Sequence, residues 1–480
     1  MAYQPVSSPL PAATLRTLPW IVAIAFFMQM LDSTILNTAI PTIAKSLHAS
    51  PLRMQSVVIA YLITVAMLIP TSGWLADRFG TKRVFIAAIA VFCLGSFLCV
   101  ISTTLKQMVL SRIVQGVGGA LMAPVGRLIV LRVFPRHQLV QVLSLITIPG
   151  MIGPLLGPAV GGILVEYVSW HWIFLINLPV GLVGGLLAMK YLPEPEDTRS
   201  DPFDWLGFFL FGAAMAAITV AIEGMGELEI AWPLTLSVLA GGLASLGGYC
   251  LHAWRAAHPL FALTVFRIRT FSVGIAGNFF ARLGSGAMPF LLPLLLQVAL
   301  GFSPAVAGLT MIPSSLCAIF SKLIVPGMIR RFGFRSILVV NTVCLGGFIA
   351  SFATIGADTP YWLIILHLVL FGAVNSIQFT AMNTVTLIDL PAEHAAGGNS
   401  ILSVVMQIAI SFGVSFSALM LSLLVGPVDA AHSRNPEVLA AFQTTFMLVG
   451  GGSILATWIF YLLPKKMAAP SPPVEVSQPH

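Results

Sequence analysis

The chain has 480 residues, of which 58% are hydrophobic and only 9% are charged, whereas a soluble domain carries about 25% charged residues. So small a charged fraction excludes a soluble globular protein, and the continuous apolar runs exclude a β-barrel, whose strands alternate in polarity. The net charge of +7 suits cytoplasmic loops beside anionic lipid and does not predict nucleic-acid binding.

Fourteen apolar segments follow in chain order, each of about the length that crosses a bilayer as a helix. They are 18–42, 54–75, 82–102, 107–131, 139–165, 171–192, 203–223, 231–251, 271–298, 304–325, 336–356, 361–387, 397–425 and 439–463. An even number of spans puts both termini on one side. The connections on that side hold most of the Lys and Arg residues outside the spans, so the positive-inside rule predicts that both termini are cytoplasmic.

The first span carries an acidic residue within the sequence LDSTILNTAIP (31–41). A carboxylate at the depth of Asp32 is costly unless it is paired, hydrated or protonated, so Asp32 is a candidate proton carrier. The alternative is that Ser33, Thr34 or Asn37 caps Asp32 in a contact that serves packing alone. Asn37 itself is a candidate for packing or for orienting a substrate.

The connection after the second span has the sequence GWLADRFGTKR (73–83). Its basic residues Arg78, Lys82 and Arg83 mark the cytoplasmic side, but an acid does not serve that purpose, so Asp77 needs another role. An Asp in this position is stabilised when it lies close to the N-terminus of a neighbouring helix.

The fourth span contains RIVQGVGGA (112–120). Arg112 cannot readily lose its proton, and a fixed cation at this depth demands an acid, a cluster of carbonyl groups or an anionic substrate. The alternative is a structural hydrogen bond between helices that Arg112 makes together with Gln115. The glycines of this segment allow close helix packing.

The fifth span contains GPLLGPAVGG (153–162). Gly153, Gly157 and Gly161 recur every four residues on one helical face, beside Gly162, and small residues in this pattern permit tight backbone contact. Pro154 and Pro158 bend or stiffen the helix. The segment therefore predicts a hinge and a seal between two halves of the protein. It is not a phosphate-binding loop, because no GKS or GKT follows.

The middle and the second half of the chain suggest an internal repeat. IRRFGFR (329–335), after the tenth span, resembles the Phe-Gly loop after the second span. If the two loops are equivalent, the chain consists of two six-helix bundles with two inserted helices, a known transporter architecture. The predicted segments are a cytoplasmic N-terminus (1–17), a first bundle (18–192), the inserted helices with an interfacial linker (193–270), a second bundle (271–463) and a disordered cytoplasmic tail (464–480). Arg330 stands where Asp77 stands in the first loop.

The deep charges bear on the cargo. Arg282 lies near the middle of the ninth span, so two deep arginines, Arg112 and Arg282, stand against one deep acid, Asp32. This balance is compatible with an anionic cargo, and we expect Arg282 to face a central cavity. Gln115, Asn375 and Asn383 are further cavity candidates, with hydrogen bonding between helices as the alternative for each.

The sequence shows no paired carboxylates, no deep nucleophile and no spacing that predicts a metal site. The five cysteines lie in apolar runs without a CxxC pattern. We therefore predict no catalytic residues, no metal ligands, no cofactor and no enzymatic activity.

These motifs together resemble the major facilitator superfamily, specifically its fourteen-span drug:proton antiporter branch, over nearly the whole chain. The segment WHWIFLINLP (170–179) completes the branch pattern. Two positions depart from it: Ser144 replaces a glycine ahead of Gly153, and His171 stands where Arg is common. The resemblance implies the all-α membrane fold of that superfamily, in a bacterial inner membrane, and we expect a monomer.

The resemblance also implies roles. Asp32 and Arg112 would couple transport to protons, and Gly73, Asp77, Arg78, Gly80 and Arg83 would form a cytoplasmic gate. The glycines and prolines of 153–162 would form the antiporter motif. The expected activity is proton-coupled export of small molecules by alternating access, of the multidrug resistance type, with small-molecule substrate, protons and membrane lipid as partners. The alternative is an exporter of a metabolite anion, such as citrate or a metal–citrate chelate, without a true multidrug role.

Overall fold

The computed structural model describes residues 12–193, 202–226, 232–257, 259–425 and 436–464. Every regular element in these residues is helical, which confirms the predicted all-α class. Residues 1–11 of the predicted N-terminal segment, 194–201 of the predicted linker and 465–480 of the predicted tail lie outside the described residues.

The helices occur in the following order. They are α1 (Ala12–Ser46), α2 (Gln55–Leu68), α3 (Thr71–Phe79), α4 (Thr81–Val100), α5 (Leu105–Val133), α6 (Arg136–Tyr167), α7 (Trp172–Leu175), α8 (Asn177–Tyr191), α9 (Trp205–Gly226), α10 (Trp232–Arg255), η1 (Leu263–Arg267), α11 (Arg269–Ser285), α12 (Met288–Leu294), η2 (Leu295–Ala299), α13 (Pro304–Thr310), α14 (Ile312–Ser351), η3 (Phe352–Thr354), α15 (Tyr361–Leu387), α16 (Ala392–Val425), α17 (Pro436–Leu455) and α18 (Thr457–Phe460).

All fourteen predicted apolar segments are helical over most of their length. By length and hydropathy, 11 helices of the described residues are candidates to cross a membrane, or 12 with the bent pair α2–α3. Two local features explain why this number is lower than the fourteen predicted spans. The run Pro304–Thr354 counts once although it contains two predicted spans and breaks at Gly333, and α9 qualifies only as a shorter apolar helix.

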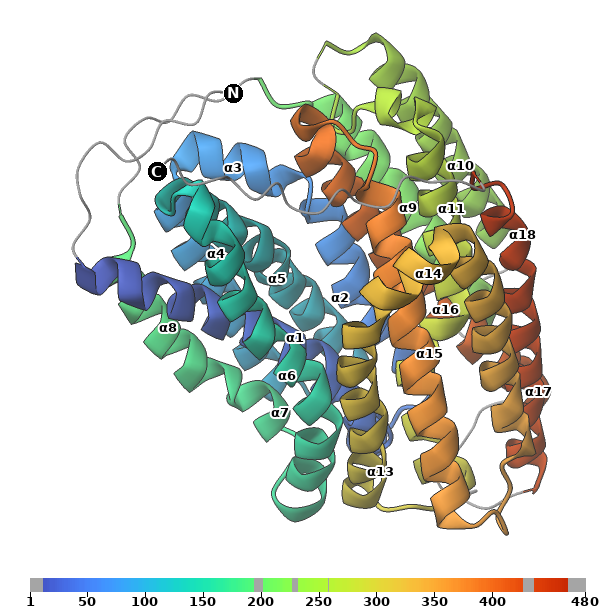
Figure 1. The fold of residues 1–480 in the computed structure, drawn as a ribbon. Helices are drawn as coiled ribbons and strands as arrows, with labels where there is room; N and C mark the ends of the chain where they lie inside the picture. The colour runs from blue at the N-terminus through green and yellow to red at the C-terminus, as the bar shows by residue number, and fades with distance from the viewer. Residues whose placement is uncertain (1–11, 194–201, 227–231, 258, 426–435, 465–480) are drawn as a thin grey trace.

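The second predicted span, 54–75, is wrong at its end. α2 stops at Leu68, and α3 begins at Thr71 after a bend of 59°. Pro70 lies at the break, and a proline cannot donate the backbone hydrogen bond that would continue α2. α3 therefore runs across one end of the molecule (Figure 1). We call this end the α3 side and the opposite end the far side.

The two Phe-Gly loops share one backbone conformation. Gly80 has φ 87° and ψ 140°, and Gly333 has φ 74° and ψ 159°. Only glycine adopts this region at little cost, so both loops need glycine at the same place. This similarity supports the predicted equivalence of the two loops, while the domain limits stay a prediction.

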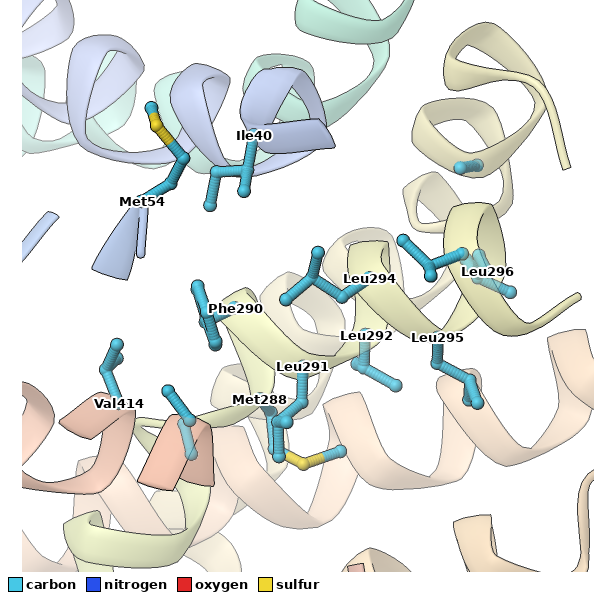
Figure 2. Close-up of a cluster of buried hydrophobic side chains, with 14 of the residues drawn as sticks. Ile40, Met54, Met288, Phe290, Leu291, Leu292, Leu294, Leu295, Leu296 and Val414 are labelled. Atoms are coloured by element: carbon cyan, nitrogen blue, oxygen red, sulfur yellow. The ribbon is translucent and has the colours of Figure 1, made fainter. Parts of the chain in front are cut away.

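The helices form two groups, α1–α8 and α11–α18, with the hairpin α9–α10 at the edge (Figure 1). One core cluster lies mostly within α1–α8, and another lies within α11–α18. A third and larger cluster joins both groups at the far side. In Figure 2, Ile40 and Met54 of the first group lie opposite Phe290 and Leu294 of α12. The two groups are thus sealed together at the far side by apolar packing.

Candidate functional site

A buried ion pair occupies the interior of the first group. The Arg112 guanidinium of α5 donates to Asp32 Oδ2 of α1 at 2.7 Å, and the side chains are 2% and 0% exposed. Gln115, one helical turn after Arg112, donates to Asp32 Oδ1 at 2.7 Å and accepts from Arg112 at 2.6 Å. The acid and the cation that the sequence singled out are therefore direct partners.

Three further side chains extend this network. Asn177, at the start of α8, donates to Asp32 Oδ1 at 3.0 Å, and Ser96 of α4 accepts from Gln115 at 2.8 Å. The ring of Tyr61 lies under the Arg112 guanidinium, 4.3 Å from its centroid. A buried ion pair is stable only when its remaining donors and acceptors are satisfied. Four helices besides α1 supply such partners, and only the Arg112 Nε remains buried without a hydrogen bond to a described residue among the side-chain atoms of the pair.

The second group holds a buried cation that contacts no acid among the residues that the structure describes. Arg282 of α11 is 0% exposed and donates to Asn278 at 3.1 Å and to Asn383 at 3.2 Å. Its guanidinium carbon stacks 3.3 Å from the centroid of Phe379. Its Nη1 has no hydrogen-bond partner among the described residues. Within the described part of the chain only neutral acceptors bind this charge, so the guanidinium can still accept an anionic partner.

Three side chains of α15 lie on the helical face that contacts Arg282. Asn375, Phe379 and Asn383 are four residues apart and so lie on one helical face. Asn375 Oδ1 is buried and lacks a hydrogen-bond partner in the described structure. The predicted cavity residues Asn375 and Asn383 thus share a face with the ring that covers Arg282. Asn37 is 7% exposed in α1, and the contacts of Asp32 do not include it.

The loop predicted as a gate links two helices of the first group through an ion pair. Asp77 of α3 pairs with Arg132 in the last turn of α5, and neither side chain is fully buried. Arg78 and Arg83 are exposed, and a Cβ on Gly73 would meet no atom within 4 Å. The acid thus links α3 to α5 of its own group.

The glycines of α6 pack against two different partners. Gly153, Gly157 and Gly161 face α1, where an added Cβ would collide with Met30, Thr34 or Thr38. Gly162 instead faces Pro304 of α13 in the second group. A matching contact runs in the other direction, because Gly308 of α13 faces the carbonyl of Pro158 in α6. The segment thus seals α6 to α1 along one face and to the other group at its far end.

Two hydrogen bonds reinforce the far-side seal between the groups. Glu166 at the end of α6 accepts from the backbone N–H of Ala305 at 2.8 Å. Gln297, within the π-helical turn η2, donates to the carbonyl of Thr38 in α1 at 2.9 Å. The far side is thus held by apolar packing, close glycine contacts and polar bonds together.

Known proteins match this chain along most of its length. Residues 22–414 and 274–479 match the family model "Major Facilitator Superfamily". The chain is 46% identical over 437 residues to the "Putative multidrug resistance protein MdtD" of Pectobacterium atrosepticum, covering 91% of this chain and 94% of that protein. The chain belongs to the Major Facilitator Superfamily. This family consists of membrane transporters and not of enzymes, as predicted.

Further relatives and solved structures agree with this membership. A protein of the same name from Salmonella heidelberg is 50% identical over 406 residues, covering 84% of this chain and 86% of that protein. A D-xylose-proton symporter matches with TM-score 0.67 at 13% identity, covering 94% of this transporter and 98% of that chain. A POT family transporter in complex with 5-aminolevulinic acid matches with TM-score 0.68 at 15% identity, covering 93% and 95%. These two structures share the fold.

Sequence reasoning missed several residues of this candidate site. Asn177, Ser96 and Tyr61 were not expected to contact Asp32 or Arg112, and Arg132 was not expected to pair with Asp77. The only available signal for Asn177 was its place inside the segment 170–179 that completes the family pattern. Ser96 and Tyr61 carry no signal in the sequence, because an isolated Ser or Tyr in an apolar span is common.

Proposed function

We propose that this facilitator-superfamily transporter is a proton-coupled antiporter that exports small molecules by alternating access. The buried pair of Asp32 and Arg112 is the observation that carries the proposal. Arg112 keeps its charge, so Asp32 is the member of the pair that can gain or lose a proton. Protonation of Asp32 removes the anion that holds Arg112 and so favours a different packing of α1 against α5.

We also propose that the transporter lies in a bacterial inner membrane with both termini and α3 on the cytoplasmic side. The excess of Lys and Arg in the connections of that side supports this orientation. The far side then faces outward. The far-side seal would make the described conformation the one closed to the outside, in which a cargo enters from the cytoplasm.

A second proposal concerns the cargo, and Arg282 favours it. A cation buried among neutral groups loses its hydration without gaining an opposite charge. An anionic group on the cargo would supply that charge and the missing partner of Nη1. This supports a small organic anion, such as a citrate-like carboxylate or its metal chelate, over a cationic drug.

The test is transport by the purified protein in proteoliposomes with an imposed pH gradient. We expect the gradient to drive uptake into inside-out vesicles, and we expect Asp32→Asn to abolish that dependence. Transport that ignores the gradient would overturn the antiport proposal.

The same vesicles separate the two cargo classes. A panel of cationic drugs and citrate-like anions is compared for the wild type, Arg282→Ala and Arg127→Met. Arg127 serves as the control because it also lies in a membrane span but, unlike Arg282, has an exposed side chain. Loss of anion transport in Arg282→Ala alone supports the anionic cargo. Unchanged transport of every anion tested refutes it and leaves proton coupling to be judged separately.

A further inference from the structure

A pocket lies between the end of α10 and the connection to α11, remote from the Asp32 and Arg282 sites. It encloses about 830 Å³ and is open to the outside. Its lining comprises Ala253, Trp254, Ala256, Ala257, Pro259, Ala262, Leu263, Thr264, Phe266 and Arg267. Its volume suits a small ligand or a headgroup.

The pocket is held in shape by bonds beneath it. Asp204, just before α9, accepts from His252 Nε2 at 2.7 Å and from the N–H of Leu260 at 2.9 Å. The Tyr249 hydroxyl accepts from the N–H of Phe261 at 3.0 Å. These bonds tie the connection to α9 and α10, so the pocket is a built feature of the hairpin.

The position of the pocket is at a membrane surface. α10 is a membrane-span candidate, and only 17% of its apolar window is buried inside the protein, so the helix faces lipid along its length. α11 begins immediately after the connection. Trp254 is 79% exposed and Phe266 is 38% exposed, and exposed aromatic side chains at the end of a span are typical of the headgroup level.

Two basic side chains lie at the pocket or directly beside it. Arg267 lines it, and Arg255 follows Trp254 in the last turn of α10. Both are exposed, and neither makes a hydrogen bond or an ion pair to a described residue. The neighbouring Arg269, by contrast, donates to the carbonyl of Leu462. Two free guanidinium groups beside an amphipathic pocket suit a phosphate with an attached apolar chain.

The helix offers a place for that chain. Leu243, Gly247 and Leu251 lie on one face of α10, and both leucines are more than half exposed. A Cβ on Gly247 would meet no atom within 4 Å, so the glycine leaves a notch on the lipid-facing surface. The notch lies two turns before Trp254, in line with the pocket.

We propose that this pocket binds the headgroup of an anionic phospholipid, with Arg255 and Arg267 on its phosphate and an acyl chain along the Leu243–Leu251 face. The site is independent of the proposed transport mechanism. With the orientation proposed above, the lipid belongs to the cytoplasmic leaflet, where basic residues meet anionic lipid.

The test measures lipid binding to the purified full-length protein by native mass spectrometry. Phosphatidylglycerol and cardiolipin are titrated against phosphatidylcholine. We expect Arg255→Gln/Arg267→Gln to lose on the order of tenfold in affinity for the anionic lipids. The matched control is Arg330→Gln/Arg331→Gln, which removes the same charge from exposed positions on the same side. Equal losses in both variants, or no loss in the pocket variant, overturn the proposal.

Fluorescence gives a second readout that does not depend on these variants. Brominated phosphatidylglycerol should quench the wild type more than Trp254→Phe, and brominated phosphatidylcholine should show a smaller difference. A last experiment adds inorganic phosphate as a competitor for the anionic lipid. If millimolar phosphate displaces the anionic lipid fully, the site binds a soluble anion and the lipid proposal is wrong.

Discussion

The contact of Gly162 with α13 allows a quantitative prediction about the far-side seal. In Gly162→Ala the new Cβ would collide with the carbonyl oxygen of Pro304. It would also lie 2.8 Å from the Pro304 carbonyl carbon and 3.1 Å from the Cα of Ala305, where ordinary contacts begin at 3.4 Å. The opposing atoms are backbone and cannot rotate away, so α6 and α13 must separate to relieve the overlap. Overpacking of this kind costs about 1–3 kcal/mol, which corresponds to a ~5- to 150-fold shift away from the sealed conformation.

The assay is a spin-label distance measured by pulsed electron resonance in reconstituted protein. Labels at Tyr167 and Trp362 suit it, because both are exposed, at 72% and 65%, near the far-side ends of α6 and α15. Gly162→Ala should increase the population of long distances. Gly308→Ala should do the same, because its Cβ would meet Pro158 in the reciprocal contact.

Gly347→Ala is the matched control, because this glycine lies within α14 and a Cβ there meets no atom within 4 Å. It should leave the distance distribution unchanged. If Gly162→Ala also leaves it unchanged, the close glycine contact does not hold the seal, and the reasoning fails.

Three further predictions concern buried or bonded charges. Asp32→Asn should lower the free energy of unfolding by about 3–5 kcal/mol, because it leaves Arg112 buried and unpaired. In a double-mutant cycle followed by thermal unfolding, adding Arg112→Met should restore much of that stability. Additive losses from the two substitutions would contradict the pairing. Arg282→Met should unfold at an equal or higher temperature than the wild type, because it removes a buried cation that pairs with no acid in the described residues. A lower unfolding temperature would count against this. Partial burial tends to raise the pKa of Asp204, but hydrogen bonds from Gly207, His252 and Leu260 outweigh it and lower the pKa below its ordinary value. The stabilisation from Asp204 is therefore present above about pH 4 and is lost as the pH falls through the lowered pKa. Hydrogen exchange in the first turn of α9, corrected for intrinsic rates, should therefore become faster in the wild type on acidification. The same acidification should change the exchange rate less in Asp204→Asn.

The sequence by itself determined the membrane class and the positions of the helices. Hydrophobicity forces the chain into lipid, and lipid forces the backbone into helices, so neither conclusion needs knowledge of tertiary contacts. The Phe-Gly repeat was also visible, because a left-handed backbone at Gly80 and Gly333 requires glycine whatever surrounds it. The break after Leu68 was missed although Pro70 marks it, because a proline inside an apolar run can also be accommodated without ending a span.

Only the tertiary structure decided which charge has a partner. The sequence showed that Asp32, Arg112 and Arg282 are each costly at depth, because that cost depends on burial alone. It could not show that Asp32 and Arg112 meet while the described hydrogen-bond partners of Arg282 are all neutral, since pairing depends on how helices distant in the chain are packed. The same holds for Gly162, whose spacing predicted close packing but whose partner in α13 is set by the docking of the two helix groups.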